Sequence, residues 1–445
     1  MTTKDVTCRK PNPEGYLAAD DFIVPLDVVD DGVPSKKEDV MKPVWLLRTL
    51  VVLLILVAAG ALSRGALTAP GPVKIGVLTP LSPPGDYAAG QLIVRGAKLG
   101  AEYVNAKGGV RSGRKVDLVI VDDSGTPEKG VAGFRKLATQ DGVITIMGQF
   151  HSSVMNAVND QAEQFGIPIF STQASAKMLT AKHLLTTFRT HVIDPDRAKL
   201  FLNLIKDKGY KRIALLAENT DYGIGMIEDT KEQKEHAKAE IELKSILFDR
   251  QVVDLTPQLL EIKAWKPDLV INIGVGTPTY LIIKQAHDIG LFPATPMLVS
   301  YDLPIRPEFW DNLGDTGNYL IYIVYYHPKM ALTEAGKWFQ ERYTQEYKEP
   351  PVYSAFNGFG QIVIIAEALN TAASDKPTDL IKALEAGKFT SWNGVVTFER
   401  GEGPYWHQWS PPMLVLQYTK ARQPWEEATI LYPPEMKTGE YTAPK

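Results

Sequence analysis

Cysteine is nearly absent from this chain of 445 residues, and its one thiol, Cys8, lies close to the N-terminus. A disulfide framework within the chain and a zinc site built on cysteines are therefore excluded. An excess of positive charge is missing as well, because 48 Lys and Arg stand against 52 Asp and Glu, for a formal net charge of −4. The composition therefore gives no indication of nucleic acid binding, and we expect no nucleic acid partner.

The sequence motifs of common enzyme classes are also missing. The chain contains no G-x-S-x-G, no H-E-x-x-H and no Walker A sequence. Gly274-Val275-Gly276 begins like a dinucleotide loop, but Thr279 stands at the position of the third glycine. The seven histidines show no metal-ligand spacing, and only His151 lies beside a candidate binding turn. We therefore expect no catalytic residues, no cofactor and no metal site.

The first 72 residues differ in composition from the rest of the chain. Residues 1–42 are rich in Asp, Lys, Pro and Gly without lasting periodicity, which predicts a disordered segment. Residues 43–62 are mostly apolar, with Arg48 as their one charged residue, and are close to the length that spans a bilayer. Basic residues precede this run, so its N-terminal end should face the cytoplasm. Residues 63–72 are expected to form a short linker.

The apolar run has two interpretations that the sequence leaves open. In one, it is an uncleaved transmembrane anchor behind a cytoplasmic tail. In the other, Met41 is the true start and residues 41–61 are a signal peptide that is cleaved near Ala61, after an apolar core and small residues. Both interpretations place the remaining chain outside the cytoplasm, in the periplasm or at the cell surface.

Strand and helix patterns alternate after residue 72. Short apolar runs, typical of buried strands, are followed by segments with helical spacing, and the series begins again near residue 194. This alternation predicts mostly parallel sheets with helices on both faces, and two series predict two α/β lobes. Ligands of open α/β sheets bind beyond the carboxyl ends of the strands. We therefore expect a ligand in the cleft between two lobes.

The last third of the chain departs from strict alternation. A long strand-like run at residues 318–326 precedes helical segments at 333–347 and 353–372, and residues 395–398 and 413–418 are predicted as a late strand pair. The first lobe needs these helices to complete its packing, so the chain should cross between the lobes more than once. Several crossings are typical of a hinge.

A serine-containing turn is the strongest candidate for a binding element. An apolar run at residues 143–147 leads into Gly148-Gln149-Phe150-His151-Ser152-Ser153, and an amphipathic helix pattern follows. The serines therefore fall where a strand ends and a helix begins, and a helix start offers unpaired N–H groups to an anion. The alternative is that one serine only caps the helix.

Several short motifs follow one another along residues 73 to roughly 420. They are Ile75-Gly76-Val77-Leu78-Thr79-Pro80-Leu81-Ser82, Arg95-Gly96-Ala97-Lys98-Leu99, Val104-Asn105-Ala106-Lys107-Gly108-Gly109-Val110, Val121-Asp122-Asp123, Gln140-Asp141-Gly142-Val143, Gly166-Ile167-Pro168, Phe188-Arg189-Thr190 and Asp221-Tyr222-Gly223. Their order and spacing resemble the leucine-binding-protein family, the branched-chain amino acid type of type I periplasmic solute-binding proteins of ABC transporters.

This resemblance implies a fold of two flavodoxin-like (Rossmann-like) α/β lobes, joined by a hinge of three crossings and closing on a ligand. Lobe 1 would comprise residues 73–191 and 328–412. Lobe 2 would comprise residues 192–327 and 413–445.

The resemblance also implies seven ligand-binding residues. The serine turn would receive the ligand carboxylate, and an acidic residue of the second lobe would hold the ammonium group. Gln173 stands where the family commonly has a small residue. The implied residues are Ser152, Ser153, Gln173, Ser175, Tyr222, Tyr87 and Asp302. Such a division suits a zwitterion, because either charge buried without a partner would cost several kcal/mol, roughly.

The function implied by the resemblance is that of an extracytoplasmic substrate-binding protein. It would capture a small carboxylate ligand, such as a branched-chain amino acid, and deliver it to an ABC permease in the membrane. A membrane-tethered ligand sensor of the same fold is the alternative, which an uncleaved N-terminal tail would favour. The sequence leaves the ligand open, because branched amino acids, aromatic acids, short amides and urea all fit this scaffold.

Overall fold

The computed structural model describes residues 71–444 of the chain. The predictions for residues 1–42 and 43–62, and for most of the linker, lie outside the described residues. Between residues 71 and 444, no helix combines the length and apolar character that crossing a membrane requires.

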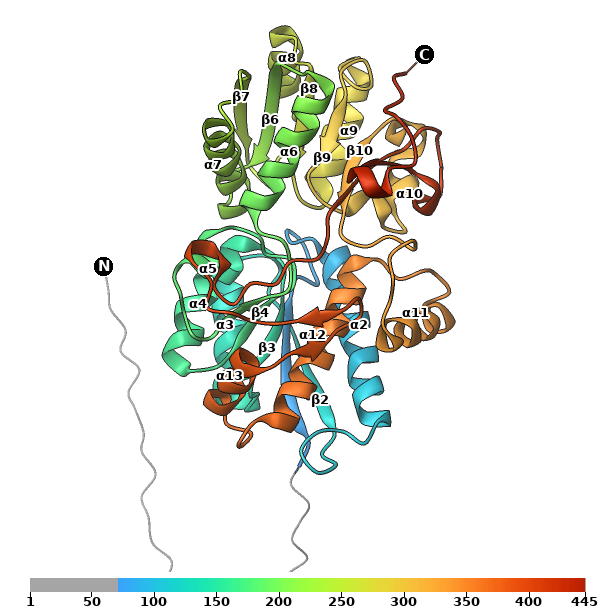
Figure 1. The fold of residues 1–445 in the computed structure, drawn as a ribbon. Coiled ribbons are helices and arrows are strands. Elements are labelled where there is room, and N and C mark those ends of the chain that lie inside the picture. The colour runs from blue at the N-terminus through green and yellow to red at the C-terminus, as the bar shows by residue number, and fades with distance from the viewer. Residues whose placement is uncertain (1–70, 445) are drawn as a thin grey trace, which may run out of the picture. The chain divides into compact units, whose positions relative to one another are not determined.

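Two sheets organise the described chain, one wholly parallel and the other parallel except for its last two strands in sequence, which pair antiparallel (Figure 1). The first has five strands in the order β2-β1-β3-β4-β5, all paired in parallel. We call this sheet and the helices packed on it lobe 1. Its strands are β1 (Val73–Thr79), β2 (Val116–Asp122), β3 (Ile146–Gln149), β4 (Ile169–Ser171) and β5 (Thr187–Arg189). Its early helices are α2 (Tyr87–Ala106), α3 (Pro127–Lys136), α4 (Ser152–Phe165) and α5 (Met178–Ala181).

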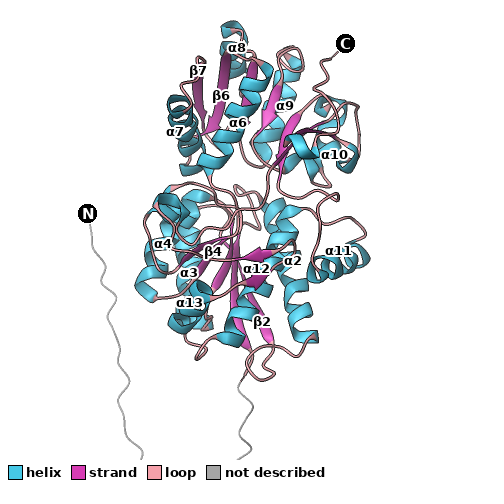
Figure 2. Cartoon of the chain, viewed as in Figure 1, coloured by secondary structure: helices cyan, strands magenta, loops and turns pink. Residues whose placement is uncertain are grey.

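The second sheet has seven strands in the order β14-β13-β10-β9-β8-β6-β7. We call this sheet and its helices lobe 2. Its strands are β6 (Arg212–Glu218), β7 (Glu242–Phe248), β8 (Leu269–Ile273), β9 (Met297–Val299), β10 (Ile321–Val324), β13 (Leu414–Gln417) and β14 (Thr429–Tyr432). Its helices are α6 (Asp194–Lys208), α7 (Asp221–His236), α8 (Thr256–Trp265), α9 (Thr277–Asp288) and α10 (Phe309–Leu313). Figure 2 shows the strands of both sheets among these helices.

The late part of the chain returns to lobe 1. Helices α11 (Glu334–Tyr347), α12 (Tyr353–Thr371) and α13 (Pro377–Ala386) follow β10, and α12 packs along α2. The chain then reaches lobe 2 again through β13. It therefore passes between the sheets three times, after β5, after β10 and before β13, as the resemblance implies.

Close contact between α2 and α12 depends on glycines of both helices. A Cβ atom added at Gly96 would lie 2.0 Å from the Ala355 carbonyl oxygen, and one at Gly358 would lie 2.5 Å from the Ile93 carbonyl oxygen. Distances this short are excluded by van der Waals repulsion. The absence of side chains at these positions therefore lets the two backbones approach each other.

Two predictions for the late strands need correction. The strand-like run at residues 318–326 forms only the four-residue β10, because residues on either side belong to loops. The late strand pair was wrong, since β12 (Val395–Val396) pairs with β11 (Phe389–Thr390) and β13 pairs with β10 and β14. A strand pattern shows that a segment can pair, but its partner is chosen by the tertiary fold.

Candidate functional site

The loops at the carboxyl ends of both sheets enclose a cavity between the lobes. Its volume is about 30 Å³, which is room for water and too little for an amino acid. A ligand would therefore have to enter while the lobes are apart. The cavity is lined by Phe150, His151, Ser152, Gln173, Ser175, His191, Arg197, Glu218, Tyr222, Val275, Tyr301, Asp302 and Tyr325.

Five of the seven predicted binding residues line this cavity. They come from four loops or helix starts, after β3, β4, β6 and β9, which lie far apart in the sequence. The five are Ser152, Gln173, Ser175, Tyr222 and Asp302.

The start of α4 carries the serine turn. His151 is the N-cap residue, has an extended backbone and makes no side-chain cap, so the alternative that a serine only caps this helix was wrong. The Ser152 hydroxyl instead accepts from the backbone N–H groups of Ser175 and Ala176, each at 3.3 Å. No side chain caps the first N–H groups of α4, which leaves them available to an anion.

His151 lies in the cavity wall as a neutral side chain. Its Nε2 accepts from the backbone N–H of Asp86 at 3.0 Å, and the residue is buried. Burial first, and then the positive charges of Arg250 and Arg306, hold the pKa of His151 well below its ordinary value. His151 therefore adds no positive charge to the helix start.

Ser153 and Tyr87 lie outside the set of residues that line this cavity. The Ser153 hydroxyl accepts from the backbone N–H of Asp221 at 3.0 Å, and so links the start of α4 to the start of α7. Tyr87, with 45% of its surface exposed, lines a second cavity of about 210 Å³ together with Asp86 and Arg306.

Asp302 is a buried carboxylate with weak partners. The Gln173 amide donates to both of its oxygens, at 3.5 Å each. Burial is the main cause that raises the pKa of Asp302 to about 6; the Asp86 charge adds to the rise and the Arg306 charge opposes it. A ligand cation beside Asp302 would stabilise its ionised form.

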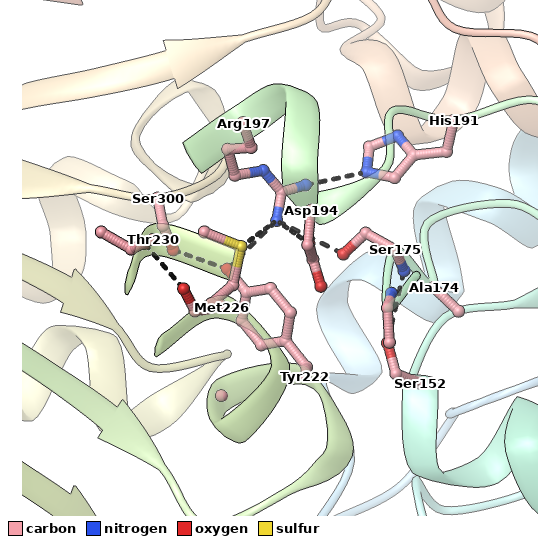
Figure 3. A network of polar contacts seen from close by, with 12 residues as sticks. Ser152, Ala174, Ser175, His191, Asp194, Arg197, Tyr222, Met226, Thr230 and Ser300 are labelled. Carbon is pink, nitrogen blue, oxygen red and sulfur yellow. Dashed lines mark hydrogen bonds and ion pairs between the residues drawn. The ribbon is translucent and has the colours of Figure 1, made fainter. Parts of the chain in front are cut away.

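Arg197 is the main site residue that the sequence did not reveal (Figure 3). Its Nη1 donates to Asp194 at 3.1 Å and to Tyr222 and Ser175 at 3.3 Å, and its Nη2 contacts His191 Nε2 at 3.2 Å. The residue is 1% exposed. The sequence offered one signal for Arg197, which is that a charged residue lies on the apolar face of the helix predicted after Asp194.

Polar contacts between the lobes surround the cavity. Arg306 Nη1 donates to both carboxylate oxygens of Asp86, at 2.9 and 2.8 Å, and both side chains are buried. Arg250 donates to the Gly125 carbonyl oxygen at 2.9 Å, and Asn156 donates to Asp221 at 3.0 Å. The structure is therefore a closed arrangement held by charged and polar pairs.

The arrangement suits capture of a small polar molecule. A helix start offers donors, Asp302 offers an acceptor with negative charge, and aromatic side chains supply apolar area with polar tips. These groups come from both lobes, so all of them meet only when the lobes are closed.

Comparison with known proteins agrees with this geometry. Residues 72–423 match the family described as periplasmic binding protein. The Leu/Ile/Val-binding protein homolog 7 of Brucella abortus (strain 2308) is 27% identical over 358 residues, which cover 75% of this chain and 87% of that relative.

Solved structures share the fold. The leucine binding protein LivK of Thermotoga maritima has a TM-score of 0.72 at 20% identity and covers 82% of this chain and 99% of its own. LivJ of Streptococcus pneumoniae, in complex with isoleucine, has a TM-score of 0.70 at 21% identity. The match covers 81% of this chain and 100% of LivJ. A solute-binding protein of R. palustris, in complex with benzoate, has a TM-score of 0.68 at 22% identity. The match covers 81% of this chain and 96% of that protein.

The family match spans well over half of the chain, and its fold is the one observed, two lobes with three crossings and a cavity between them. The chain therefore belongs to the periplasmic binding protein family, with the two-lobed type I fold.

Proposed function

We propose that this protein binds an amino acid in the cavity between its lobes and delivers it to an ABC permease. The observation that carries this proposal is the presence, in one closed cavity, of an uncapped helix start and a weakly paired buried carboxylate. These are the two partners that a zwitterion needs.

The start of α4 is proposed to receive the ligand carboxylate. The partial positive charge and free N–H groups of a helix start stabilise an anion, and no cap competes for them here. Ser152 supports this surface indirectly, since its hydroxyl holds the backbone of Ser175 and Ala176 in place.

Asp302 is proposed to receive the ligand ammonium group. The carboxylate is fully buried, and its contacts with Gln173 are long for hydrogen bonds. An ammonium group would therefore replace weak contacts by a charge-assisted hydrogen bond.

Ligand binding is proposed to favour closure of the two lobes. The helix start belongs to lobe 1 and Asp302 to lobe 2, so a bound zwitterion contacts both lobes only in the closed arrangement. A ligand shifts a conformational equilibrium by its difference in affinity for the two states.

Mass spectrometry of molecules that co-purify with the full chain, followed by calorimetry with amino acids and with benzoate, tests this function. We expect an amino acid to bind. Benzoate has no amino group for Asp302, so it should bind at least about tenfold more weakly, which is the effect of losing one charge-assisted hydrogen bond. Tight binding of benzoate with no binding of any amino acid would contradict the proposal.

The second candidate is a membrane-tethered ligand sensor with the same cavity. It is favoured only by the predicted anchor at residues 43–62 and the tail before it. N-terminal sequencing of the exported protein separates the two. A mature start near Leu62 removes the anchor and leaves the transport role.

A further inference from the structure

The lobe 2 wall of the cavity is more polar than a site for an aliphatic side chain requires. Arg197, Tyr222 and Tyr325 all line it, and each is buried. Tyr222 is already hydrogen-bonded to Ser300 at 2.7 Å. An aliphatic side chain packed against this wall would, however, leave the Tyr325 hydroxyl and Arg197 Nε without partners in a dry site. This mismatch points to a ligand whose side chain makes hydrogen bonds.

The guanidinium group of Arg197 has an N–H donor that makes no hydrogen bond within residues 71–444. A guanidinium group has five N–H donors. Nη1 faces Asp194, Tyr222 and Ser175, and Nη2 faces His191, whereas Nε has no hydrogen-bond partner among the described residues. An oxygen acceptor of a ligand could therefore be received here without displacing Asp194.

Tyr325 supplies a second polar group, close to Arg197. It follows β10, lines the cavity and is fully buried, and its hydroxyl makes no hydrogen bond of normal geometry within residues 71–444. Its ring centroid lies 5.8 Å from Arg197 Cζ. A phenol hydroxyl can accept a hydrogen bond from a ligand N–H.

The charge of Arg197 is already balanced. The buried Asp194 carboxylate lies 3.1 Å from Nη1. Burial, followed by the charges of Arg197 and Arg189, holds the pKa of His191 well below its ordinary value, so His191 is neutral. Arg189 does not line the cavity, and its Nη atoms donate to the Ser175 and Ala176 carbonyl oxygens and to Thr180.

A second ligand carboxylate at this wall would thus meet Asp194 without a free counter-charge. An uncharged acceptor avoids that repulsion and still satisfies Arg197. A primary amide offers such an acceptor in its carbonyl oxygen, together with an N–H donor for Tyr325.

We propose that Arg197 and Tyr325 recognise a side-chain amide, so that the protein prefers amino acids such as glutamine or asparagine over branched aliphatic ones. This inference rests on the proposed function, which places the ligand carboxylate at α4 and the ammonium group at Asp302. Arg197 would donate to the amide oxygen, and Tyr325 would accept from the amide nitrogen.

Calorimetry of the full chain with glutamine, asparagine, glutamate, leucine and isoleucine tests the preference. We expect glutamine or asparagine to bind at least about tenfold more tightly than leucine, isoleucine and glutamate. This difference is the effect of leaving one buried polar group of the protein without a hydrogen-bond partner. Leucine or glutamate binding as tightly as both amides would overturn this inference and leave the proposed function standing. Failure of all five to bind would overturn this inference, and the proposed function would fall with it only if no other amino acid bound.

Tyr325→Phe isolates the tyrosine contribution, because it removes the hydroxyl and keeps the ring. We expect glutamine affinity to fall about three- to tenfold, as for one neutral hydrogen bond, with leucine affinity unchanged. Tyr322→Phe is the matched control, since Tyr322 is equally buried but lies outside the cavity lining, and it should leave both affinities unchanged. An equal loss for glutamine and leucine in Tyr325→Phe would refute the assignment.

Arg197→Lys tests the arginine while keeping a positive charge near Asp194. A lysine lacks the planar fork of donors, so we expect the preference for glutamine over leucine to shrink while leucine still binds. Thermal unfolding of each variant shows whether the fold is intact. An undiminished preference in a folded Arg197→Lys variant would remove Arg197 from the proposal.

Discussion

At the scale of single residues, Asp302 connects binding to pH. Its pKa in the folded protein is raised to about 6 mainly by burial, so it loses its charge within a mildly acidic range. A raised carboxyl pKa means that the folded state binds more protons than the unfolded state between pH 4 and 6, roughly. Stability contributed by the neutral form is therefore lost as pH rises through that range.

The first prediction is a pH-dependent affinity for an amino acid ligand. Asp302 must be ionised to hold the ammonium group, so affinity should fall about tenfold between pH 7 and pH 5, following the ionised fraction of a group with a pKa near 6. Calorimetry at the two pH values measures this change in affinity.

The Asp302→Asn variant is the control. It should bind the ligand weakly at both pH values. Without ligand, its free energy of unfolding at pH 7 should exceed that of the unchanged protein by at most about 3 kcal/mol. A persisting pH dependence in this variant would assign the titration to another group.

The second prediction separates the two serines. Ser152→Ala removes the acceptor of two backbone N–H groups inside lobe 1, so it should lower the free energy of unfolding by about 1–3 kcal/mol and weaken binding at least tenfold. Ser153→Ala removes a contact to Asp221 across the lobes, so it should weaken binding with little change in stability. Urea unfolding and calorimetry measure the two effects. Equal stability losses in both variants would contradict this division.

At the scale of elements, α4 contributes to the binding cavity, whereas the pair α2 and α12 contributes to the packing of lobe 1. The start of α4 is presented to the cavity without a cap, whereas α2 and α12 form a tight contact that joins the early and late parts of lobe 1. Mutations at the start of α4 should therefore weaken binding, whereas mutations at the contact between α2 and α12 should affect stability alone.

The third prediction concerns the contact between α2 and α12. Gly96→Ala would place a Cβ atom 2.0 Å from the Ala355 carbonyl oxygen, so the helices must separate. We expect a loss of about 1–3 kcal/mol in stability from overpacking, measured by urea unfolding. Gly225→Ala in α7 is the control, because its nearest atom would lie at 3.9 Å, and it should stabilise the protein by about 0.5–1 kcal/mol. A harmless Gly96→Ala variant would mean that the two helices are not so close.

At the scale of the whole molecule, closure depends on contacts between residues far apart in sequence. The buried pair of Asp86 and Arg306 joins the lobes directly. When the lobes open, both side chains can be hydrated, so their attraction contributes to the equilibrium between open and closed states.

The fourth prediction follows from this pair. Asp86→Asn removes the negative charge but keeps a side chain that can cap α2. The closed state would then bury Arg306 without its counter-ion, so we expect a larger radius of gyration in X-ray scattering and a ligand affinity at least tenfold weaker, roughly. Lys244→Ala is the control, because its pair with Glu261 lies partly exposed within lobe 2 and should contribute little. A closed Asp86→Asn protein with full affinity would show that the pair does not control closure.

The fold was largely predictable because its signals are local. Short apolar runs and helical spacing indicated two α/β series, the second of which begins near residue 194. Late strands were less predictable, since the pairing of β13 with β10 and β14 depends on residues outside the local pattern. The boundaries proposed for the two lobes, and the seven ligand-binding residues, stay predictions until they are tested.

The sequence by itself determined the alternation of strands and helices and the placement of polar residues after the strands, because both depend on residues that are neighbours along the chain. Only the tertiary structure decided that Arg197 enters the cavity, that Ser153 links the lobes and that Asp86 pairs with Arg306. These contacts arise when two separately folded surfaces meet. The charge balance of the cavity is therefore a property of the closed molecule, which no local pattern contains.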